Sequence, residues 1–154
     1  MIEYTKGNLL EADCEAIVNP VNTVGVMGKG LAKQFKIKFP DNFKAYETAC
    51  NTGRLVTGKV FIFETGQLFN PKYIVNFPTK IHWRNPSRID YILRGMESLS
   101  SEILRRKIQS IAVPALGCGL GGLDWIRVKS VLEHHFNAME VYALVFEPNI
   151  VTEY

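Results

Sequence analysis

Short apolar segments alternate with amphipathic segments along almost the whole chain. The apolar segments are rich in Ile, Val, Phe and Tyr and predict β-strands, whereas the segments between them carry apolar residues at helical spacing. Strands that alternate with helices predict an α/β fold, in which helices cover both faces of a sheet. We expect strands at 2–6, 16–18, 60–64, 73–77, 110–113 and 141–146, and helices at 31–39, 41–52, 87–106 and 124–136.

The length and composition predict one globular domain with reduced cysteines. The 154 residues match the size of a single domain, and the formal net charge of +3 permits an anionic partner without requiring one. Cys14, Cys50 and Cys118 are too widely spaced for a disulfide framework or a CxxC metal site, which predicts thiols in a cytoplasmic protein. No apolar run approaches the roughly 18 residues that span a bilayer, so we expect no membrane contact.

Two glycine-rich loops stand where a predicted strand leads into a predicted helix. The first is NPVNTVGVMGKGLA at 19–32, and the second is PALGCGLGGLDW at 114–125. In α/β sheets the loops that leave the carboxyl ends of strands form the ligand site, so we expect both loops to face one cleft. Glycines let backbone N–H groups approach an anion closely, and a helix N-terminus behind the loop favours negative charge. The pair could cradle a diphosphate; the alternative is that both are simply tight turns.

Neither loop fits a common nucleotide-binding motif in full. In the first loop the spacing before the lysine is too short for a P-loop, and Gly30 stands where a magnesium ion needs a hydroxyl. The second loop matches G-x-G-x-x-G through Gly117, Gly119 and Gly122, but no chain is left after it for the rest of a Rossmann sheet. The sequence therefore argues against a nucleotide triphosphatase and against a dinucleotide-binding enzyme.

Three segments of the chain resemble the macro domain family. They are GNLLEADCEAIVNPVNTVGVMGKGLAKQFK, FPTK and VPALGCGLGGLDW, and the resemblance covers nearly the whole chain. Macro domains are ADP-ribose-binding α/β modules, and the similarity is greatest to those of DarG-type antitoxins, which reverse the ADP-ribosylation of DNA by DarT-type toxins. The resemblance implies a three-layer α-β-α domain over residues 1–154, with a mixed sheet of about six strands. We expect a monomer, and the resemblance implies neither a cofactor nor a metal.

The resemblance also implies which residues hold ADP-ribose. Asn8 with Leu9 would meet the adenine; most macro domains have Asp in place of Asn8, whose amide oxygen can still accept a hydrogen bond. Gly121 stands where the related terminal ADP-ribose glycohydrolase has a catalytic Asp, and the nearby Asp124 fits better as a helix cap. The remaining implied contacts are Asn19, Val24, Gly25, Val26, Met27, Gly28, Lys29 and Gly30 in the first loop, Thr79, and Pro114, Leu116, Gly117, Cys118, Gly119, Leu120 and Gly121 in the second.

Lys80, in the segment FPTK, is the best candidate for a reactive group. The pair of carboxylates that ordinary glycosidases use is not evident, whereas the resemblance matches Lys80 to the lysine that de-ADP-ribosylation requires. A neutral lysine can attack the ring-opened ribose and form a Schiff base, and a charged lysine can stabilise an anion on the leaving group; the sequence leaves both routes open. Asn22 can orient the ribose through its amide, the alternative being an Asx-turn residue that closes the loop.

The segment IHWRNPSR, which follows Lys80, combines one large aromatic residue with cations. If Lys80 lies at the scissile bond, His82, Trp83 and Arg84 lie beside the leaving group and Arg88 can meet a phosphate, a combination suited to single-stranded nucleic acid. The alternative for Trp83 is a packing residue.

The resemblance implies a DNA ADP-ribosyl glycohydrolase that acts on thymine bases of single-stranded DNA. A DarT-type toxin would be a partner through a further C-terminal region that such antitoxins usually carry, so the chain would be a piece of a longer protein. The alternatives are a non-catalytic ADP-ribose-binding module and a glycohydrolase that acts on modified protein.

Overall fold

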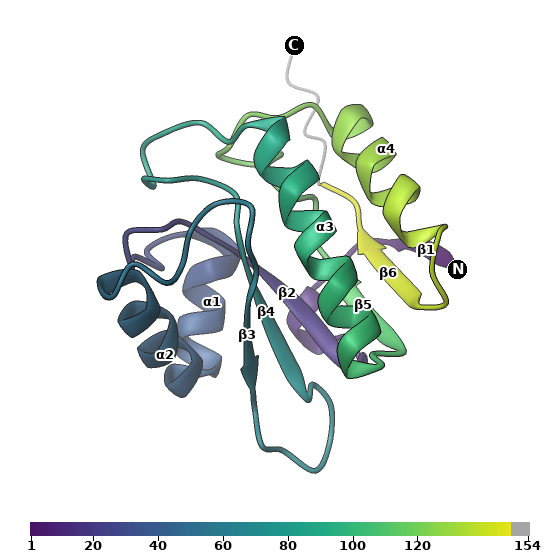
Figure 1. Ribbon diagram of the computed structural model, residues 1–154, viewed down its shortest axis with the longest axis horizontal. Helices are drawn as coiled ribbons and strands as arrows, with labels where there is room; N and C mark the ends of the chain where they lie inside the picture. The colour runs from purple at the N-terminus through teal and green to yellow at the C-terminus, as the bar shows by residue number, and fades with distance from the viewer. Residues whose placement is uncertain (149–154) are drawn as a thin grey trace.

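A six-stranded sheet lies between two layers of helices in the computed structural model, which describes residues 1–148 (Figure 1). The predicted α/β fold, with three layers and a mixed sheet, is confirmed. The strands are β1 (Ile2–Thr5), β2 (Ala16–Val21), β3 (Phe61–Glu64), β4 (Tyr73–Pro78), β5 (Ser110–Val113) and β6 (Tyr142–Phe146). The helices are a short 3-10 turn η1 (Leu9–Glu11), α1 (Gly30–Lys38), α2 (Pro40–Asn51), α3 (Ile89–Arg106) and α4 (Trp125–Phe136).

The strand order β1-β6-β5-β2-β4-β3 brings the two glycine loops to one edge of the sheet. Strand β2 pairs in parallel with both β4 and β5, and Ile17 is in register with Ile74 on one side and Ala112 on the other. The carboxyl ends of these three strands therefore point the same way. The loops that follow β2, β4 and β5 meet there, as expected for the ligand-binding edge of an α/β sheet.

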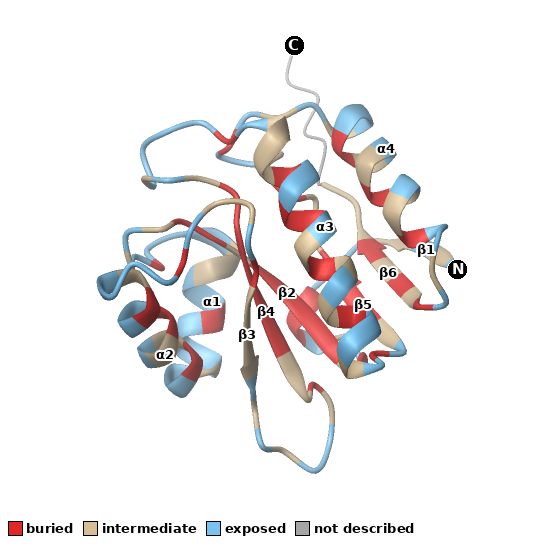
Figure 2. Cartoon of the chain, in the orientation of Figure 1, coloured by how far each residue is buried: buried red, intermediate tan, exposed pale blue. Residues whose placement is uncertain are grey.

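Alternate residues of the central strands pack into separate cores on the two faces of the sheet. Ala16 and Val18 pack with α3 and α4, whereas Ile17 packs with Phe35 of α1 on the opposite face. Figure 2 shows β2, β4 and β5 as the most deeply buried part of the sheet. Leu144 and Phe146 of β6 face away from α3 and α4 and are only half-buried. On that face of the sheet α1 and α2 lie over β2, β4 and β3, so they cover β6 less fully (Figure 1).

Strand β2 runs to Val21, three residues further than predicted, and includes Pro20. Proline has no N–H group to donate to a neighbouring strand. Strand β5 pairs with β2 only at Ala16 and Ile17, so one side of β2 needs no partner at Pro20. Pro20 can therefore lie inside β2, near its carboxyl end. The sequence predicts that this strand ends at residue 18, before the proline.

Two predicted helix starts are wrong. Helix α3 begins at Ile89 with Arg88 as its N-cap and without a side-chain cap, two residues later than the predicted start at residue 87. Asp90 accepts a charged hydrogen bond from Arg88 at 3.1 Å. Helix α2 begins at Pro40 rather than after Asp41, because proline is well suited to the first position of a helix, where no N–H partner is needed.

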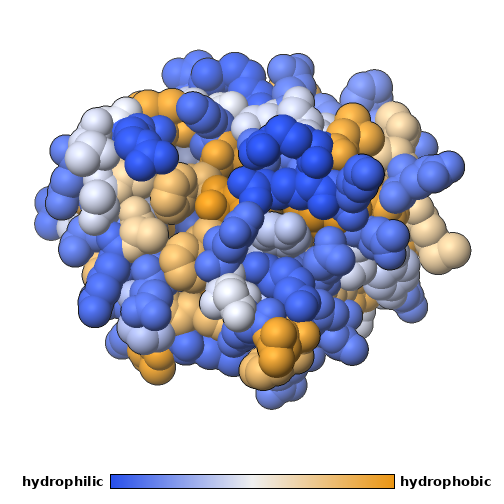
Figure 3. Space-filling view, turned by 60° about the horizontal axis from the view of Figure 1, so that its bottom comes forward, coloured by the Kyte–Doolittle hydropathy of each residue, from blue (hydrophilic) through white to orange (hydrophobic). Residues whose placement is uncertain are grey.

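The end of the molecule opposite the glycine loops, which Figure 3 turns toward the viewer, is covered mostly by polar side chains. The apolar groups there form separate patches. Among the exposed apolar residues of this end are Leu68 and Phe69, in the loop between β3 and β4. No helix within residues 1–148 is long and apolar enough to cross a membrane. The same residues contain no group of three His, Cys, Asp or Glu side chains that could hold a metal ion.

Candidate active site

The Asn22 side chain closes the first glycine loop. Its Oδ1 accepts hydrogen bonds from the backbone N–H groups of Val24 at 3.1 Å and Val26 at 3.3 Å, and its Nδ2 donates to the Val26 carbonyl at 2.7 Å. The hydroxyl of Tyr46 approaches both the backbone oxygen and Oδ1 of Asn22 at 2.8 Å. Asn22 therefore closes the loop, which is the alternative role that the sequence analysis gives it. One N–H of its amide remains free to meet a ligand.

A chain of buried amides supports the loop from beneath. Asn19 Nδ2 donates to Asn76 Oδ1 at 3.2 Å and lies 3.8 Å from the sulfur of Met27, while Asn76 and Asn42 exchange two hydrogen bonds at 2.9 and 3.2 Å. Asn19 and Met27, both predicted ligand contacts, are completely or almost completely buried. Their side chains hold the loop on β2, β4 and α2, so in this conformation they do not line the ligand surface.

The N-terminus of α1 is open to an anion. Lys29 is its N-cap residue, yet no side chain caps the helix and no acidic residue stands in its first turn. The uncapped N–H groups and the helix dipole favour negative charge at this point. Val24, Val26, Gly28 and Gly30 are exposed around it, and Gly30 has a φ of +58°.

Lys80 lies just after β4. The residues before and after it, Thr79 and Ile81, are both hydrogen-bonded to the first glycine loop. Thr79 N–H donates to the Val21 carbonyl at 2.9 Å, and Thr23 donates to the Ile81 carbonyl through both its N–H and its hydroxyl, each at 2.9 Å. The Lys80 Nζ lies 3.4 Å from the Trp83 carbonyl and forms no salt bridge with any described carboxylate. Burial lowers the pKa of Lys80, which is half-buried, below its ordinary value.

The second glycine loop is folded against Ser87. The Ser87 N–H donates to the Gly121 carbonyl at 3.0 Å. A Cβ at position 121 would overlap the Ser87 hydroxyl and stand 2.6 Å from the carbonyl oxygen of Gly117. The loop therefore requires glycine where a related enzyme carries a catalytic aspartate. Asp124 is the N-cap of α4, as its position in the sequence predicts. Its carboxylate accepts a hydrogen bond from the Ile126 N–H at 3.4 Å.

Other predicted residues of this loop differ in what they can offer a ligand. Leu116 is fully buried in the core, so its side chain only anchors the loop. Gly119 and Leu120 are exposed, and Pro114 and Gly117 are half-buried. Burial raises the pKa of the Cys118 thiol to about 11, which keeps it protonated and argues against a nucleophilic role.

Residues 80–88 connect the two glycine loops. Thr23 holds this segment near Ile81 and Gly121 holds it at Ser87. Between these points the His82 and Trp83 rings lie 5.0 Å apart, and the Arg84 guanidinium lies 4.5 Å from the Trp83 ring. Trp83 is 42% exposed, so it is not a simple packing residue.

Arg88 and Asn8, two other predicted site residues, already have partners within the chain. Arg88 is exposed and pairs with Asp90. Asn8 is exposed and caps η1 by accepting a hydrogen bond from Leu10 N–H at 3.1 Å, so its amide nitrogen remains to meet a ligand. Leu9, by contrast, is buried in the core, which leaves only its backbone for a ligand.

Sequence reasoning missed Tyr46, Thr23 and Ser87, which position the loops. Tyr46 belongs to an apolar stripe of α2 that predicted only core packing. Thr23 and Ser87 make backbone contacts with segments far along the chain. A local pattern carries no sign of such contacts.

The chain is similar in sequence to known proteins. The family model described as Macro domain matches residues 18–132. The DNA ADP-ribosyl glycohydrolase of Thermus aquaticus is 50% identical over 149 residues, which cover 96% of this chain and 41% of that protein. The chain thus spans about two-fifths of the length of the DNA ADP-ribosyl glycohydrolases that it matches.

Solved structures give the same result. The macrodomain of Mycobacterium tuberculosis DarG matches with a TM-score of 0.95 at 51% identity, covering 97% of this chain and 99% of that chain. Thermosipho africanus DarTG in complex with ADP-ribose matches with a TM-score of 0.89 at 33% identity, covering 96% of this chain and 42% of that chain. The fold of this chain is the one that these proteins share.

Proposed function

Since this chain belongs to the macro domain family, we propose that it is a DNA ADP-ribosyl glycohydrolase that removes ADP-ribose from thymine bases of single-stranded DNA. A relative that is 50% identical carries the name of this activity. In the complete protein the domain would act as an antitoxin against a DarT-type toxin. A glycohydrolase linked to a DNA ADP-ribosyl transferase in a fusion protein of Thermosipho africanus supports this partnership.

The observation that carries the proposal is the position of Lys80. Its amine is half-buried without a carboxylate partner among residues 1–148, in a segment hydrogen-bonded to the first glycine loop. A lysine in such surroundings loses its proton more readily than an exposed one. A non-catalytic binding module has no need of an amine with this property.

Burial lowers the pKa of Lys80, which is the direction that the nucleophilic route requires, and we propose that route. The neutral Nζ attacks C1″ of the ribose, the bond from C1″ to the thymine nitrogen breaks, and the base takes up the proton that Nζ loses once its bond to C1″ has formed. The adduct opens to a Schiff base, which water hydrolyses to regenerate the amine and release ADP-ribose. In the electrostatic route a charged Lys80 would only stabilise the departing base.

The two glycine loops hold the ADP-ribose in this proposal. The diphosphate lies at the uncapped N-terminus of α1, where Gly28, Lys29 and Gly30 are exposed. The remaining N–H of Asn22 orients the distal ribose, and the Asn8 side chain meets the adenine. The backbone of the second loop, from Gly117 to Gly121, lies across the diphosphate.

The modified base and its neighbours lie on the 80–88 segment. The adjacent rings of His82 and Trp83 offer an aromatic surface to a base, and the Arg84 guanidinium lies over the Trp83 ring. Arg88 can bind a phosphate if its ion pair with Asp90 opens.

The test compares ADP-ribosylated single-stranded DNA with ADP-ribosylated protein, using the wild type and two variants at Lys80. We expect release of ADP-ribose from the DNA only, and near-complete loss in Lys80→Ala with ADP-ribose binding retained. Lys80→Arg keeps the charge without a usable nucleophile, so it separates the two routes, and borohydride should trap a covalent adduct only in the wild type.

Each other outcome contradicts part of the proposal. Binding without turnover in the wild type would identify a non-catalytic module. Release from protein alone would identify a different substrate. Wild-type turnover by Lys80→Ala would show that Lys80 is not catalytic.

A further inference from the structure

The positive charge of this chain is concentrated in one segment. Residues 24–51 contain five lysines and two carboxylates, Asp41 and Glu47. This excess equals the formal net charge of +3 of the whole chain, so the other residues are neutral in sum. Helix α1, which lies inside the segment, has no acidic residue. A helix with only cations is unusual on a surface where charges are otherwise balanced.

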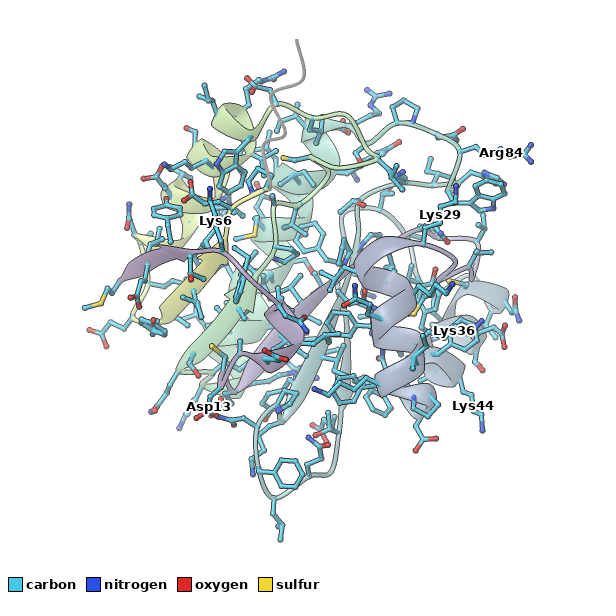
Figure 4. The ribbon with its side chains drawn as sticks, turned by 180° about the vertical axis from the view of Figure 1, so that it is seen from behind. Lys6, Asp13, Lys29, Lys36, Lys44 and Arg84 are labelled. Carbon is cyan, nitrogen blue, oxygen red and sulfur yellow. The ribbon has the colours of Figure 1, made fainter. Side chains whose placement is uncertain are left out.

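Four of the five lysines of this segment follow one side of the molecule, starting at the candidate active site. Lys29, Lys33 and Lys36 are spaced so that they share one face of α1. Figure 4 shows Arg84, Lys29, Lys36 and Lys44 one after another along the same side of the molecule, from the 80–88 segment past α1 to α2. We call Lys29, Lys33, Lys36 and Lys44 the lysine edge.

No carboxylate among residues 1–148 neutralises the charges of the lysine edge. No salt bridge among residues 1–148 involves these lysines, and neither Asp41 nor Glu47 pairs with any cation there. Lys36 is held over the Phe43 ring at 4.4 Å. An aromatic ring orients a cation without cancelling its charge, as Trp83 does for Arg84 at the start of the path.

We propose that the lysine edge binds the phosphates of the DNA strand as it continues away from the modified base, on one side only. The inference rests on the proposed function, because the strand must enter from the 80–88 segment. From Lys29 to Lys36 the edge runs about 10 Å along α1, which corresponds to about three phosphates of a stacked strand. Contacts of this kind add affinity that does not depend on base sequence.

The test measures binding of catalytically inactive protein to ADP-ribosylated oligonucleotides over a range of salt concentrations. Both Lys36 and Lys44 are changed to Gln, and a control with the same charge change carries Lys6→Gln and Lys107→Gln, exposed lysines on other elements. Each phosphate contact contributes roughly 0.7 to the slope of log affinity against log salt for a single strand. We therefore expect the slope to fall by about 1.4 in the Lys36/Lys44 variant and to be unchanged in the control.

Oligonucleotides extended only on the 5′ side or only on the 3′ side of the modified base test the direction of the path. The Lys36/Lys44 variant should weaken binding of one of them and leave the other unchanged. Equal losses for both extensions, loss in the control variant as well, or an unchanged salt slope would overturn the proposal.

An ADP-ribosylated mononucleotide separates this inference from the proposed function. It is too short to reach Lys36, so in an otherwise wild-type background its hydrolysis should be the same with and without the two changes. If the wild type hydrolyses neither the mononucleotide nor the oligonucleotide, the proposed function itself is wrong. If it hydrolyses both and the two lysines make no difference, only the lysine edge is wrong.

Discussion

Replacing Tyr46 by Phe should loosen the first glycine loop without leaving a cavity. Tyr46 is fully buried, and its hydroxyl is the donor that joins α2 to both oxygens of Asn22 at 2.8 Å. Burial raises the pKa of Tyr46 far above its ordinary value of 10.0, so the lost interaction is between neutral groups. Phe keeps the ring in place, and the Asn22 Oδ1 retains its two backbone donors. The free energy of unfolding should therefore fall by about 1–2 kcal/mol, the cost of one buried hydrogen bond and a poorly satisfied carbonyl.

Part of this loss should appear in the affinity for ADP-ribose. The loop can bind a diphosphate only in its closed conformation, and the Tyr46 hydroxyl stabilises that conformation in the free protein. If half of the loss, about 0.5–1 kcal/mol, is local to the loop, the dissociation constant for ADP-ribose should rise about two- to fivefold, since 1.4 kcal/mol corresponds to a factor of ten. Urea unfolding gives the stability, and titration calorimetry gives the affinity. Tyr91→Phe, on α3 and outside the loop, serves as the control.

The two measurements together decide whether the reasoning holds. A loss of stability with an unchanged affinity for ADP-ribose would show that the loop closes without Tyr46. An unchanged stability would show that the hydroxyl contributes nothing to the fold. Either result would remove the link between α2 and the candidate site.

Three further changes test other parts of the site. Gly121→Ala should destabilise the protein by about 1–3 kcal/mol through overpacking and abolish ADP-ribose binding, as thermal unfolding and calorimetry would measure. Gly119→Ala, whose Cβ meets nothing within 4 Å, should leave the thermal stability unchanged. Trp83→Ala should weaken binding of modified DNA with little change for free ADP-ribose; equal affinity for modified DNA in a direct titration would refute the aromatic surface. If Lys80 attacks as a neutral amine, kcat/KM should rise with pH up to its pKa, which lies below 10.5, because the neutral fraction grows with pH; a rate that falls over that range would favour the charged form.

The alternation of strands and helices was predictable because it depends on patterns within a few residues of each other. The apolar runs at β2, β4 and β5 and the helical spacing of α3 and α4 were read correctly from the sequence. The common edge of the two loops followed from the parallel pairing that such alternation favours. The exact ends of elements were harder, as Pro20 shows. Whether a proline ends a strand depends on which neighbour lies beside it, and the sequence does not state that.

The role of an individual site residue was predictable only where its contacts are with residues close to it in the sequence. Asp124 caps the helix that directly follows it, as its sequence position indicated. Ser87 has the residue type and spacing of a helix cap, yet it packs against Gly121 from another loop, and the helix starts without it. Lys80 gave no signal beyond its resemblance to a known motif. Its half-buried environment comes from segments that only the fold brings together.

The same long-range contacts explain why the chemistry depends on more than the motif residues. Lys80 lies in a segment that is bonded to the first loop through Thr23 and to the second loop through Ser87. A ligand that orders either loop therefore acts on the backbone that carries the amine. In the proposed complex a diphosphate between the two loops would therefore bear on the backbone that carries Lys80, because both attachments are backbone hydrogen bonds to these loops. The proposal then predicts that a substitution which alters either attachment, while it leaves Lys80 and every proposed ligand contact intact, lowers turnover.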